Sequence, residues 1–137
     1  MNKFMEIAYR EALKAYKKDE IPVGAVVVRN NKIIAKSHNN RQKKYNLLGH
    51  AEINCLIKAG KKIKDWRLDE CDMYVTLAPC KMCLIHIQEA RIKNVYYLLN
   101  QQKIKQNIKS VQKISDCHNL SVEYENKIKE FFGKLRK

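Results

Sequence analysis

The sequence predicts an α/β fold in which helices cover both faces of a central mixed sheet of about five strands. An apolar run over residues 23–28, a polar turn and a second β-rich segment over 33–37 indicate a β-hairpin. Helix-like and strand-like segments then alternate along the chain, an order that is typical of helices packed on the faces of a sheet. With 137 residues and no repeat or linker, residues 1–137 are expected to form a single domain.

The other elements up to residue 99 follow from hydrophobic periodicity and from the positions of proline and glycine. Residues 2–18 carry apolar side chains at helical spacing, and Pro22 prevents this helix from continuing. The expected order after the hairpin is a loop over 38–48, a helix over 50–59 with Gly60 as its C-cap, a strand over 71–77, a helix over about 80–89 opened by Pro79, and a strand over 93–99.

The C-terminal third has a weaker pattern. An apolar stripe predicts a helix within residues 100–118, through Ile104, Ile108, Val111 and Ile114. A short strand is expected over 120–124. A basic helix is expected from about Glu125 to Lys134.

The chain is strongly basic, with 28 Lys and Arg against 14 Asp and Glu and a formal net charge of +14. This balance favours a polyanionic partner such as nucleic acid. The alternative is that the lysine excess, which accompanies abundant Asn and Ile, reflects an AT-rich genome. No apolar run reaches the ~18 residues of a membrane span, and the N-terminus lacks a signal-peptide core. We therefore expect a cytoplasmic protein with no membrane partner.

Two short motifs carry the chemistry, H-x-E at His50 and Glu52 and P-C-x-x-C at residues 79–83. His50, Cys80 and Cys83 supply three zinc ligands and leave a fourth position open, as catalytic zinc sites do. Cys80 and Cys83 share one face at a helix start, where thiolates are favoured. His50 and Glu52 can face one ion only if His50 lies at a helix entrance. The zinc is therefore expected between two helix N-termini.

A glutamate beside an open zinc position indicates hydrolytic chemistry. Zinc lowers the pKa of a bound water, and Glu52 would take its proton and pass it to a departing amine. The site suits hydrolytic loss of ammonia from an amidine-like ring carbon. One alternative is a structural Cys₂His₂ site closed by His86. A redox C-x-x-C pair is another, but it would need neither His50 nor Glu52.

On these motifs the chain resembles the bacterial tRNA-specific adenosine deaminases of the cytidine deaminase-like superfamily. The matching stretches are residues 20–26, 50–53, 67–68, 74–77, 79–83 and 91–92. The resemblance implies a cytidine deaminase-like three-layer α/β/α fold, with one Zn²⁺ per subunit on His50, Cys80 and Cys83 and proton shuttling by Glu52. It also implies a homodimer that converts the wobble adenosine in the anticodon stem-loop of an arginine tRNA to inosine.

The resemblance also implies a set of substrate contacts. Asn39 matches the asparagine that binds the target nucleoside, and Pro22 with Val23 matches one wall of the base pocket. Further contacts are expected at Ala51, Ala78, Pro79, Phe132 and Arg136. Phosphates next to the base are expected on Lys103, Lys105, Lys109, Lys134 and Arg136. The alternatives are solvated surface cations and core packing of Phe132.

The zinc motif is compatible with three functions. The leading hypothesis is a zinc-dependent tRNA adenosine deaminase. A deaminase of a free base or nucleotide, such as cytosine, deoxycytidylate or guanine, would carry the same motif. A catalytically weak, zinc-containing RNA-binding partner is the third, supported by two departures from the family pattern, Ala78 in place of Glu and Gln101 in place of an acidic loop residue.

Overall fold

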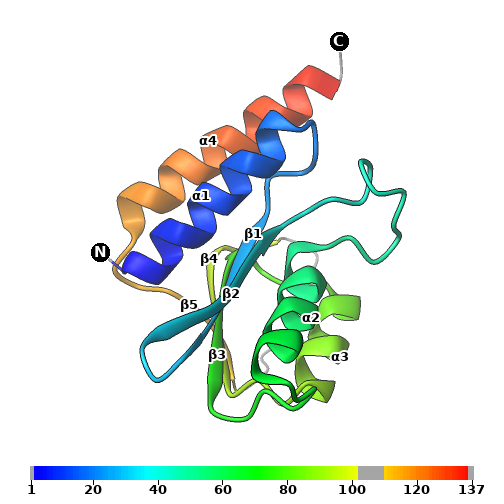
Figure 1. Ribbon diagram of the computed structural model, residues 1–137. Helices are drawn as coiled ribbons and strands as arrows, with labels where there is room; N and C mark the ends of the chain where they lie inside the picture. Colours follow the sequence, from blue (N-terminus) through cyan, green and yellow to red (C-terminus); the bar gives the residue numbers. More distant parts are fainter. Residues whose placement is uncertain (1, 102–109, 136–137) are drawn as a thin grey trace.

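The computed structural model describes residues 2–101 and 110–135, and Figure 1 shows its helices and strands. In chain order these are α1 (Lys3–Lys17), β1 (Gly24–Arg29), β2 (Lys32–His38), α2 (Ala51–Ile63), β3 (Cys71–Leu77), α3 (Lys81–Glu89), β4 (Asn94–Leu99), β5 (Val111–Lys113) and α4 (His118–Leu135). The elements predicted up to residue 99 are all present, with boundaries close to those expected.

The strands form one five-stranded mixed sheet in the order β2-β1-β3-β4-β5. β1 is antiparallel to both β2 and β3, whereas β3, β4 and β5 are parallel. Helices α1 and α4 cover one face of the sheet, and α2 and α3 cover the other (Figure 1). The predicted three-layer α/β/α fold with a mixed sheet is thus confirmed.

Strand β1 lies inside the sheet, between β2 and β3, and this position explains why the run over residues 23–28 is apolar. Ala25 and Val27 pack into the core under α2 and α3, whereas Val26 and Val28 pack into the core under α1. A strand that is buried on both faces needs apolar side chains without alternation. β1 therefore joins the two cores of the molecule.

The β1–β2 hairpin closes through a two-residue turn. Asn30 and Asn31 both have left-handed backbone, with φ of 51° and 62°. This is the conformation that matches the twist of paired strands, and asparagine tolerates it well. The predicted hairpin is confirmed.

Helix α2 is longer than expected, and the predicted C-cap at Gly60 is wrong. The helix runs through Gly60 to Ile63, and Lys64 is the C-cap with φ of 60°. Lys61 and Lys62 in the last turn favour the continuation, because cations are stabilised at a helix C-terminus. Ile63 packs against the core and gives the extra turn an apolar anchor.

The C-terminal third differs most from the expectation. Val111–Lys113 form strand β5 beside β4 instead of continuing a helical stripe; Ile104 and Ile108 lie outside the described residues. The strand expected over 120–124 is wrong, because α4 begins at His118. Leu120 and Tyr124 are buried one helical turn apart, so the apolar period of α4 extends through the segment read as a strand.

Cys55, Cys71 and Cys117 are buried free thiols that pack in the two cores as small apolar residues. Among the residues that the structure describes, no helix has the length and apolar character needed to cross a membrane.

Candidate active site

Two neighbouring helices begin at one end of the sheet, and their first residues carry the two motifs. His50 is the N-cap of α2, with extended backbone at φ −81° and ψ 146°. Cys80 is the N-cap of α3 at φ −71° and ψ 170°, and Cys83 lies in the first turn of that helix. The expected position of His50 at a helix entrance is confirmed, and it allows His50 and Cys83 to approach from two different helices.

The imidazole of His50 and the thiols of Cys80 and Cys83 meet at these helix ends, and their ligand atoms all lie within 4.8 Å of one another. Cys83 is buried, whereas His50 and Cys80 are half-buried. Hydrogen bonds with Cys83 and His50 lower the pKa of Cys80 to about 3. The hydrogen bond with Cys80 and burial raise the pKa of Cys83. A thiolate at Cys80 is therefore favoured at neutral pH.

This donor set fits a zinc ion. One imidazole and two sulfurs are ligands that Zn²⁺ takes in tetrahedral sites, and three protein ligands leave one position for water or substrate. His86, the alternative fourth ligand, is exposed, and its Nδ1 lies 2.8 Å from the carbonyl oxygen of Met82. It is not part of the ligand group found among the described residues. The geometry supports an open site rather than a closed Cys₂His₂ site.

Glu52 lies in the first turn of α2, with only 4% of its surface exposed. Burial raises the pKa of its carboxyl to about 7. A carboxyl group that titrates near neutral pH can accept a proton and release it again within one reaction cycle. The burial of Glu52 beside the ligand group thus gives a carboxyl group whose pKa suits general acid–base catalysis.

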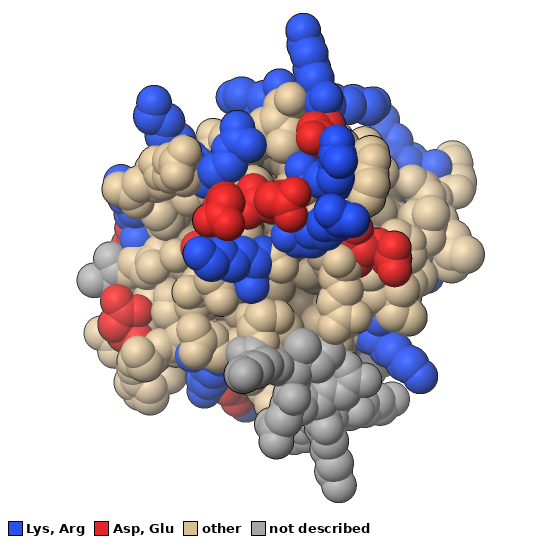
Figure 2. All heavy atoms as spheres, turned by 90° about the horizontal axis from the view of Figure 1, so that it is seen from below, with Lys and Arg blue, Asp and Glu red and all other residues tan. Residues whose placement is uncertain are grey.

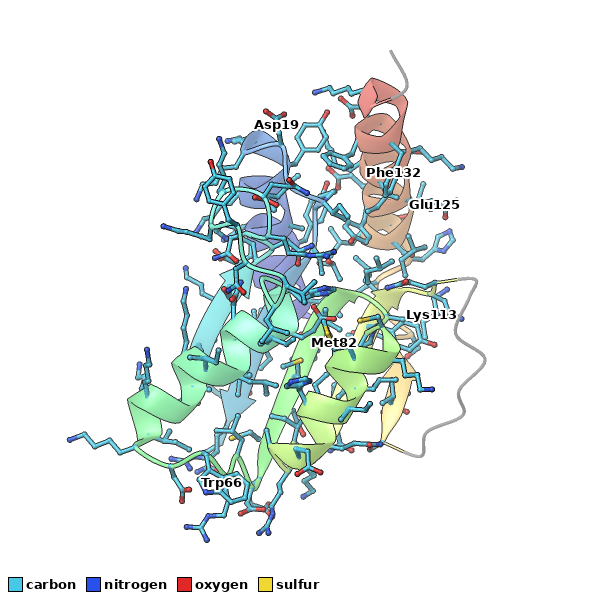
Figure 3. The ribbon with its side chains drawn as sticks, turned by 90° about the vertical axis from the view of Figure 1, so that its right-hand side faces the viewer. Asp19, Trp66, Met82, Lys113, Glu125 and Phe132 are labelled. Atoms are coloured by element: carbon cyan, nitrogen blue, oxygen red, sulfur yellow. The ribbon has the colours of Figure 1, made fainter. Side chains whose placement is uncertain are left out.

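A cavity of about 220 Å³ opens onto this group. It is lined by Ile21, Val23, Asn39, His50, Glu52, Leu77, Cys80, Gln101, Ile128 and Phe132. The predicted contacts Val23, Asn39 and Phe132 are therefore brought together around it. Figure 3 shows α4, which carries Phe132, above the N-terminal end of α3, where Met82 lies.

Several lining residues were not predicted as contacts. Ile128 lies one helical turn before Phe132, so the i, i+4 spacing on a helix is a signal that could have found it. Gln101 reaches the cavity from the end of β4, and its Nε2 donates to the carbonyl oxygen of Ala78 at 2.6 Å. The two positions that depart from the family pattern therefore contact each other. Ile21 and Leu77 gave no sequence signal for this role.

The other predicted contacts lie behind the cavity wall or outside the described residues. Pro22, Ala78 and Pro79 are buried next to lining residues but do not line the cavity themselves. Ala51 lies behind His50 and donates its N–H to Asn39. Of the basic residues proposed to hold phosphates, Lys134 is exposed on α4. Lys103, Lys105, Lys109 and Arg136 lie outside the described residues.

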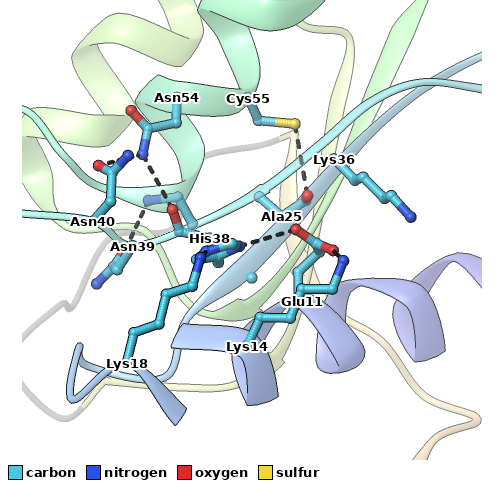
Figure 4. A network of polar contacts seen from close by, with 12 residues as sticks. Glu11, Lys14, Lys18, Ala25, Lys36, His38, Asn39, Asn40, Asn54 and Cys55 are labelled. Atoms are coloured by element: carbon cyan, nitrogen blue, oxygen red, sulfur yellow. Dashed lines mark hydrogen bonds and ion pairs between the residues drawn. The ribbon is translucent and has the colours of Figure 1, made fainter. Parts of the chain in front are cut away.

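A hydrogen-bond network holds Asn39 in place (Figure 4). Its side-chain oxygen accepts from the N–H of Ala51 at 2.7 Å. Asn54, on α2, donates to the carbonyl oxygen of His38 at 3.1 Å and to the side chain of Asn40 at 2.9 Å. Asn54 thus fixes the residues on both sides of Asn39. The side-chain amide of Asn39 therefore meets the cavity in a defined orientation.

His38 precedes Asn39 but points to the opposite side. Its Nδ1 lies 3.1 Å from the carboxylate of Glu11, a buried residue of α1, and Lys14 donates to the same carboxylate at 2.6 Å (Figure 4). Burial alone would raise the pKa of Glu11, but its bonds to Lys14 and His38 lower it. His38 does not line the cavity and instead joins β2 to α1 through Glu11.

Comparison with known proteins assigns the class of this fold and site. The family model described as the cytidine and deoxycytidylate deaminase zinc-binding region matches residues 1–99. The chain therefore belongs to the cytidine deaminase-like family of zinc-binding deaminases. A likeness to the solved guanine deaminase from Bacillus subtilis, with a TM-score of 0.70 and 27% identity over 92% of this chain and 94% of that chain, is consistent with this.

Two further likenesses define the branch within that family. The chain is 38% identical over 144 residues to the tRNA-specific adenosine deaminase of Rickettsia typhi, covering 96% of this chain and 97% of the relative. It also resembles a structure solved in a study of A-to-I editing by tRNA:A34 deaminases at the wobble position of transfer RNA. That likeness has a TM-score of 0.74 and 34% identity and covers 81% of this chain and 96% of the other. This branch is the tRNA-specific adenosine deaminases.

Proposed function

We propose that this protein removes the amino group of the wobble adenosine in the anticodon loop of a tRNA and converts it to inosine. The observation that carries the proposal is the buried Glu52 beside His50, Cys80 and Cys83 in a cavity of about 220 Å³. Pockets for drug-sized ligands measure roughly 300–1,000 Å³, so this one suits a single base. The relatives named tRNA-specific adenosine deaminase support adenosine in tRNA as the substrate.

The reaction exchanges one C–N bond of the base for one C–O bond, with water as the other reactant. Held by His50, Cys80 and Cys83, one zinc ion per subunit would supply a water of lowered pKa next to the base. Glu52 takes the proton from the attacking water and delivers it to the amino group, which leaves as ammonia. Asn39 orients the nucleoside through its amide. Phe132 and Val23 provide apolar walls that exclude bulk water.

The RNA partner is supported by charge and by the chemistry of the pocket. The net charge of +14 favours a polyanion. An adenosine must leave its stack to reach Glu52, and a folded anticodon loop offers bases that are already unpaired. We propose an arginine tRNA with adenosine at the wobble position, in a cytoplasmic setting, with residues 1–137 acting as a single zinc-dependent deaminase domain.

The test is an inosine assay on the purified, zinc-loaded protein. It uses an arginine-tRNA anticodon stem-loop with adenosine at the wobble position, and Glu52→Ala as the inactive variant. Inosine from the Glu52 protein alone supports the proposal. No inosine from either protein contradicts it.

The solved guanine deaminase of similar fold favours one second candidate, a deaminase of free bases. Its test runs beside the first, with ammonia release from guanine, cytosine and deoxycytidylate as the readout. Ammonia from one of these, without inosine in RNA, would favour the second candidate. Zinc and RNA binding without ammonia from any substrate would leave a catalytically weak RNA-binding partner.

We also propose a homodimer that forms through the outer face of α2 and α3. A groove of about 840 Å³ lies there, and its lining includes Leu48, Ile57 and Trp66. These side chains are 41%, 52% and 62% exposed, and Ile85 on α3 is 51% exposed. An apolar patch of this kind is typical of a protein interface. Sedimentation of the protein and of its Ile57→Lys variant tests this, and an unchanged monomer in both would contradict it.

A further inference from the structure

The loop that joins β2 to α2, residues 39–50, begins and ends at the cavity and carries an exposed aromatic side chain between its ends. Its end residues, Asn39 and His50, both line the cavity. Figure 1 shows the loop projecting beyond the sheet, from the end at which α2 begins. Residues 42–48 are all exposed, and Tyr45 is exposed to 96%. An aromatic ring this exposed makes almost no contribution to the core.

The backbone of the 39–50 loop is nevertheless firmly held from below. Glu20, of which only 2% is exposed, accepts hydrogen bonds from the successive amides of Gln42 at 3.0 Å and Lys43 at 2.7 Å. Within the loop, the N–H of Asn46 donates to the carbonyl oxygen of Arg41 at 3.0 Å. Hydrogen bonds to a buried carboxylate are strong, so the middle of the loop is fixed to the body of the protein.

The two ends of the 39–50 loop are joined by a backbone hydrogen bond. The N–H of Asn40 donates to the carbonyl oxygen of Gly49 at 2.9 Å. A Cβ at Gly49 would lie 2.6 Å from the side-chain oxygen of Asn40 and 2.8 Å from the nitrogen of Arg41, so only glycine allows this approach. Tyr45 has φ of 48°, which is uncommon for a bulky residue. The fixed loop therefore holds Tyr45 in a conformation that it would rarely adopt alone.

Three cations lie close to Tyr45 in the sequence. Arg41, Lys43 and Lys44 belong to the loop, and residues 39–49 contain no Asp or Glu. None of the three forms an ion pair within the part of the chain that the structure describes. The face of the molecule in Figure 2, seen from below, instead carries acidic side chains among its basic ones. All formally charged side chains of residues 39–49 are thus positive, and the same loop carries the exposed aromatic side chain of Tyr45.

We propose that the 39–50 loop binds single-stranded RNA next to the base that enters the cavity. Tyr45 stacks on a neighbouring base, and Arg41, Lys43 and Lys44 hold the adjacent phosphates. The cavity accepts one base, so the nucleotides on either side of it must cross the surface around its opening. Stacking on an aromatic ring combined with phosphate contacts is the way in which single strands are bound. This proposal rests on the proposed function, and it names the surface that would bind the RNA next to the target base.

The test measures binding of the zinc-loaded, full-length protein to an anticodon stem-loop. Purine riboside, which has no amino group to lose, replaces the wobble adenosine, so turnover does not interfere. Tyr45→Ala is expected to weaken binding by roughly 5- to 150-fold, the range for loss of one stacked base. Tyr45→Trp keeps a ring and is expected to bind about as tightly as the wild type.

The cations are tested by the dependence of binding on salt. Lys43→Gln combined with Lys44→Gln is expected to reduce the slope of log Kd against log salt by about 1.4, or ~0.7 for each phosphate contact to a single strand. Lys32→Gln is the control, because Lys32 lies at the start of β2 and the 39–50 loop follows the other end of that strand. With the reactive stem-loop, the Tyr45 and lysine variants are expected to raise KM and leave kcat within about twofold.

Three results would overturn the proposal. They are wild-type affinity in Tyr45→Ala, equal losses in Tyr45→Ala and Tyr45→Trp, and a changed oligomeric state in Tyr45→Ala, which would assign the ring to a protein interface. The wild type could bind the stem-loop more tightly than Tyr45→Ala and yet make no inosine. That result would refute the proposed function and support RNA binding by the 39–50 loop. Inosine formation with the same KM in the wild type and in Tyr45→Ala would support the proposed function and refute the RNA-binding role of the 39–50 loop.

Discussion

Helix α1 begins in a different way from α2 and α3. Asn2 caps α1, and its side-chain oxygen accepts hydrogen bonds from the amides of Phe4 at 2.9 Å and Met5 at 3.2 Å. The N-cap residues of α2 and α3 are His50 and Cys80, whose side chains make no capping hydrogen bond. They turn instead toward each other and toward Cys83.

The difference separates a helix end that is closed by its own cap residue from two whose N-cap residues belong to the ligand group. Replacing a good N-cap residue typically costs about 1 kcal/mol of stability. At α2 the preceding loop offsets part of this stability cost, because the side chain of Asn39 accepts a hydrogen bond from the N–H of Ala51. The exposed amides of both helix starts remain near the ligand group, where they favour thiolates. The loss of capping at α2 and α3 is therefore part of how the site is built.

Removing zinc should give the largest effect, because the N-cap residues of α2 and α3 form the ligand group in place of capping their helices. Dialysis against a chelator under reducing conditions is expected to lower deaminase activity by several orders of magnitude, because the activated water is lost. It should also lower the free energy of unfolding by about 4 kcal/mol for zinc at a thousand times its Kd. Metal analysis and thermal unfolding measure both effects, and added zinc should restore them. Full activity in metal-free protein would contradict the proposed site.

Glu52→Gln should lower kcat by roughly 10²- to 10⁴-fold, the usual contribution of a general acid–base group. Zinc content is expected to stay unchanged, because the ligands are intact. The matched control is Glu11→Gln, since Glu11 is equally buried at 4% exposed but bonds to His38 and Lys14 away from the cavity. Steady-state kinetics on both variants should show the loss in Glu52→Gln alone, and equal losses would argue against a catalytic role.

Asn39 has two proposed roles, capping α2 through the N–H of Ala51 and binding the substrate, and two variants can separate them. Asn39→Ala should lose about 1 kcal/mol of stability with the cap on Ala51, and should raise KM by roughly 2- to 12-fold through one lost hydrogen bond to the substrate. Asn39→Asp keeps the acceptor for the N–H of Ala51 and removes the amide donors. It is expected to recover the stability but not the KM. Recovery of both quantities in Asn39→Asp would show that the asparagine only caps the helix.

Asn2→Ala should have the smallest effect on activity. Loss of the cap on α1 is expected to cost roughly 0.5–2 kcal/mol in the free energy of unfolding. kcat and KM should stay at wild-type values, because α1 contributes no residue to the cavity lining. Denaturant unfolding and the inosine assay check this, with Asn2→Asp as the variant that retains a cap. A drop in kcat would mean that α1 affects the active site more directly than its contacts show.

The grouping of His50, Cys80 and Cys83 was largely accessible from the sequence, because each lies at or just inside a helix start that local signals mark. Gly49 and the apolar period after it mark the start of α2, and Pro79 marks the start of α3. The sheet up to β4 was accessible for the same reason. Its strands are short apolar runs between clear turn residues.

Other features depend on contacts between distant segments and left no local signal. Gln101 reaches Ala78 across 23 positions, and Tyr124 donates to the carbonyl oxygen of Pro22 across 102. No local pattern in the sequence indicates that Glu20 is buried and that it accepts hydrogen bonds from the amides of Gln42 and Lys43. The start of α4 differs from the prediction because residues 120–124 alternate apolar and polar side chains, a local pattern that suits a strand.

The sequence by itself determined the layered α/β/α fold, the ligand types and the glutamate beside them, because periodicity and motif spacing act within one helix or strand. Only the tertiary structure decided which residues enclose the cavity, where α4 begins, and which backbone amides Glu20 and Asn54 hold. Those outcomes depend on the packing of segments that are far apart in the chain. That packing is set by shape and burial across the whole molecule and by no single stretch of residues.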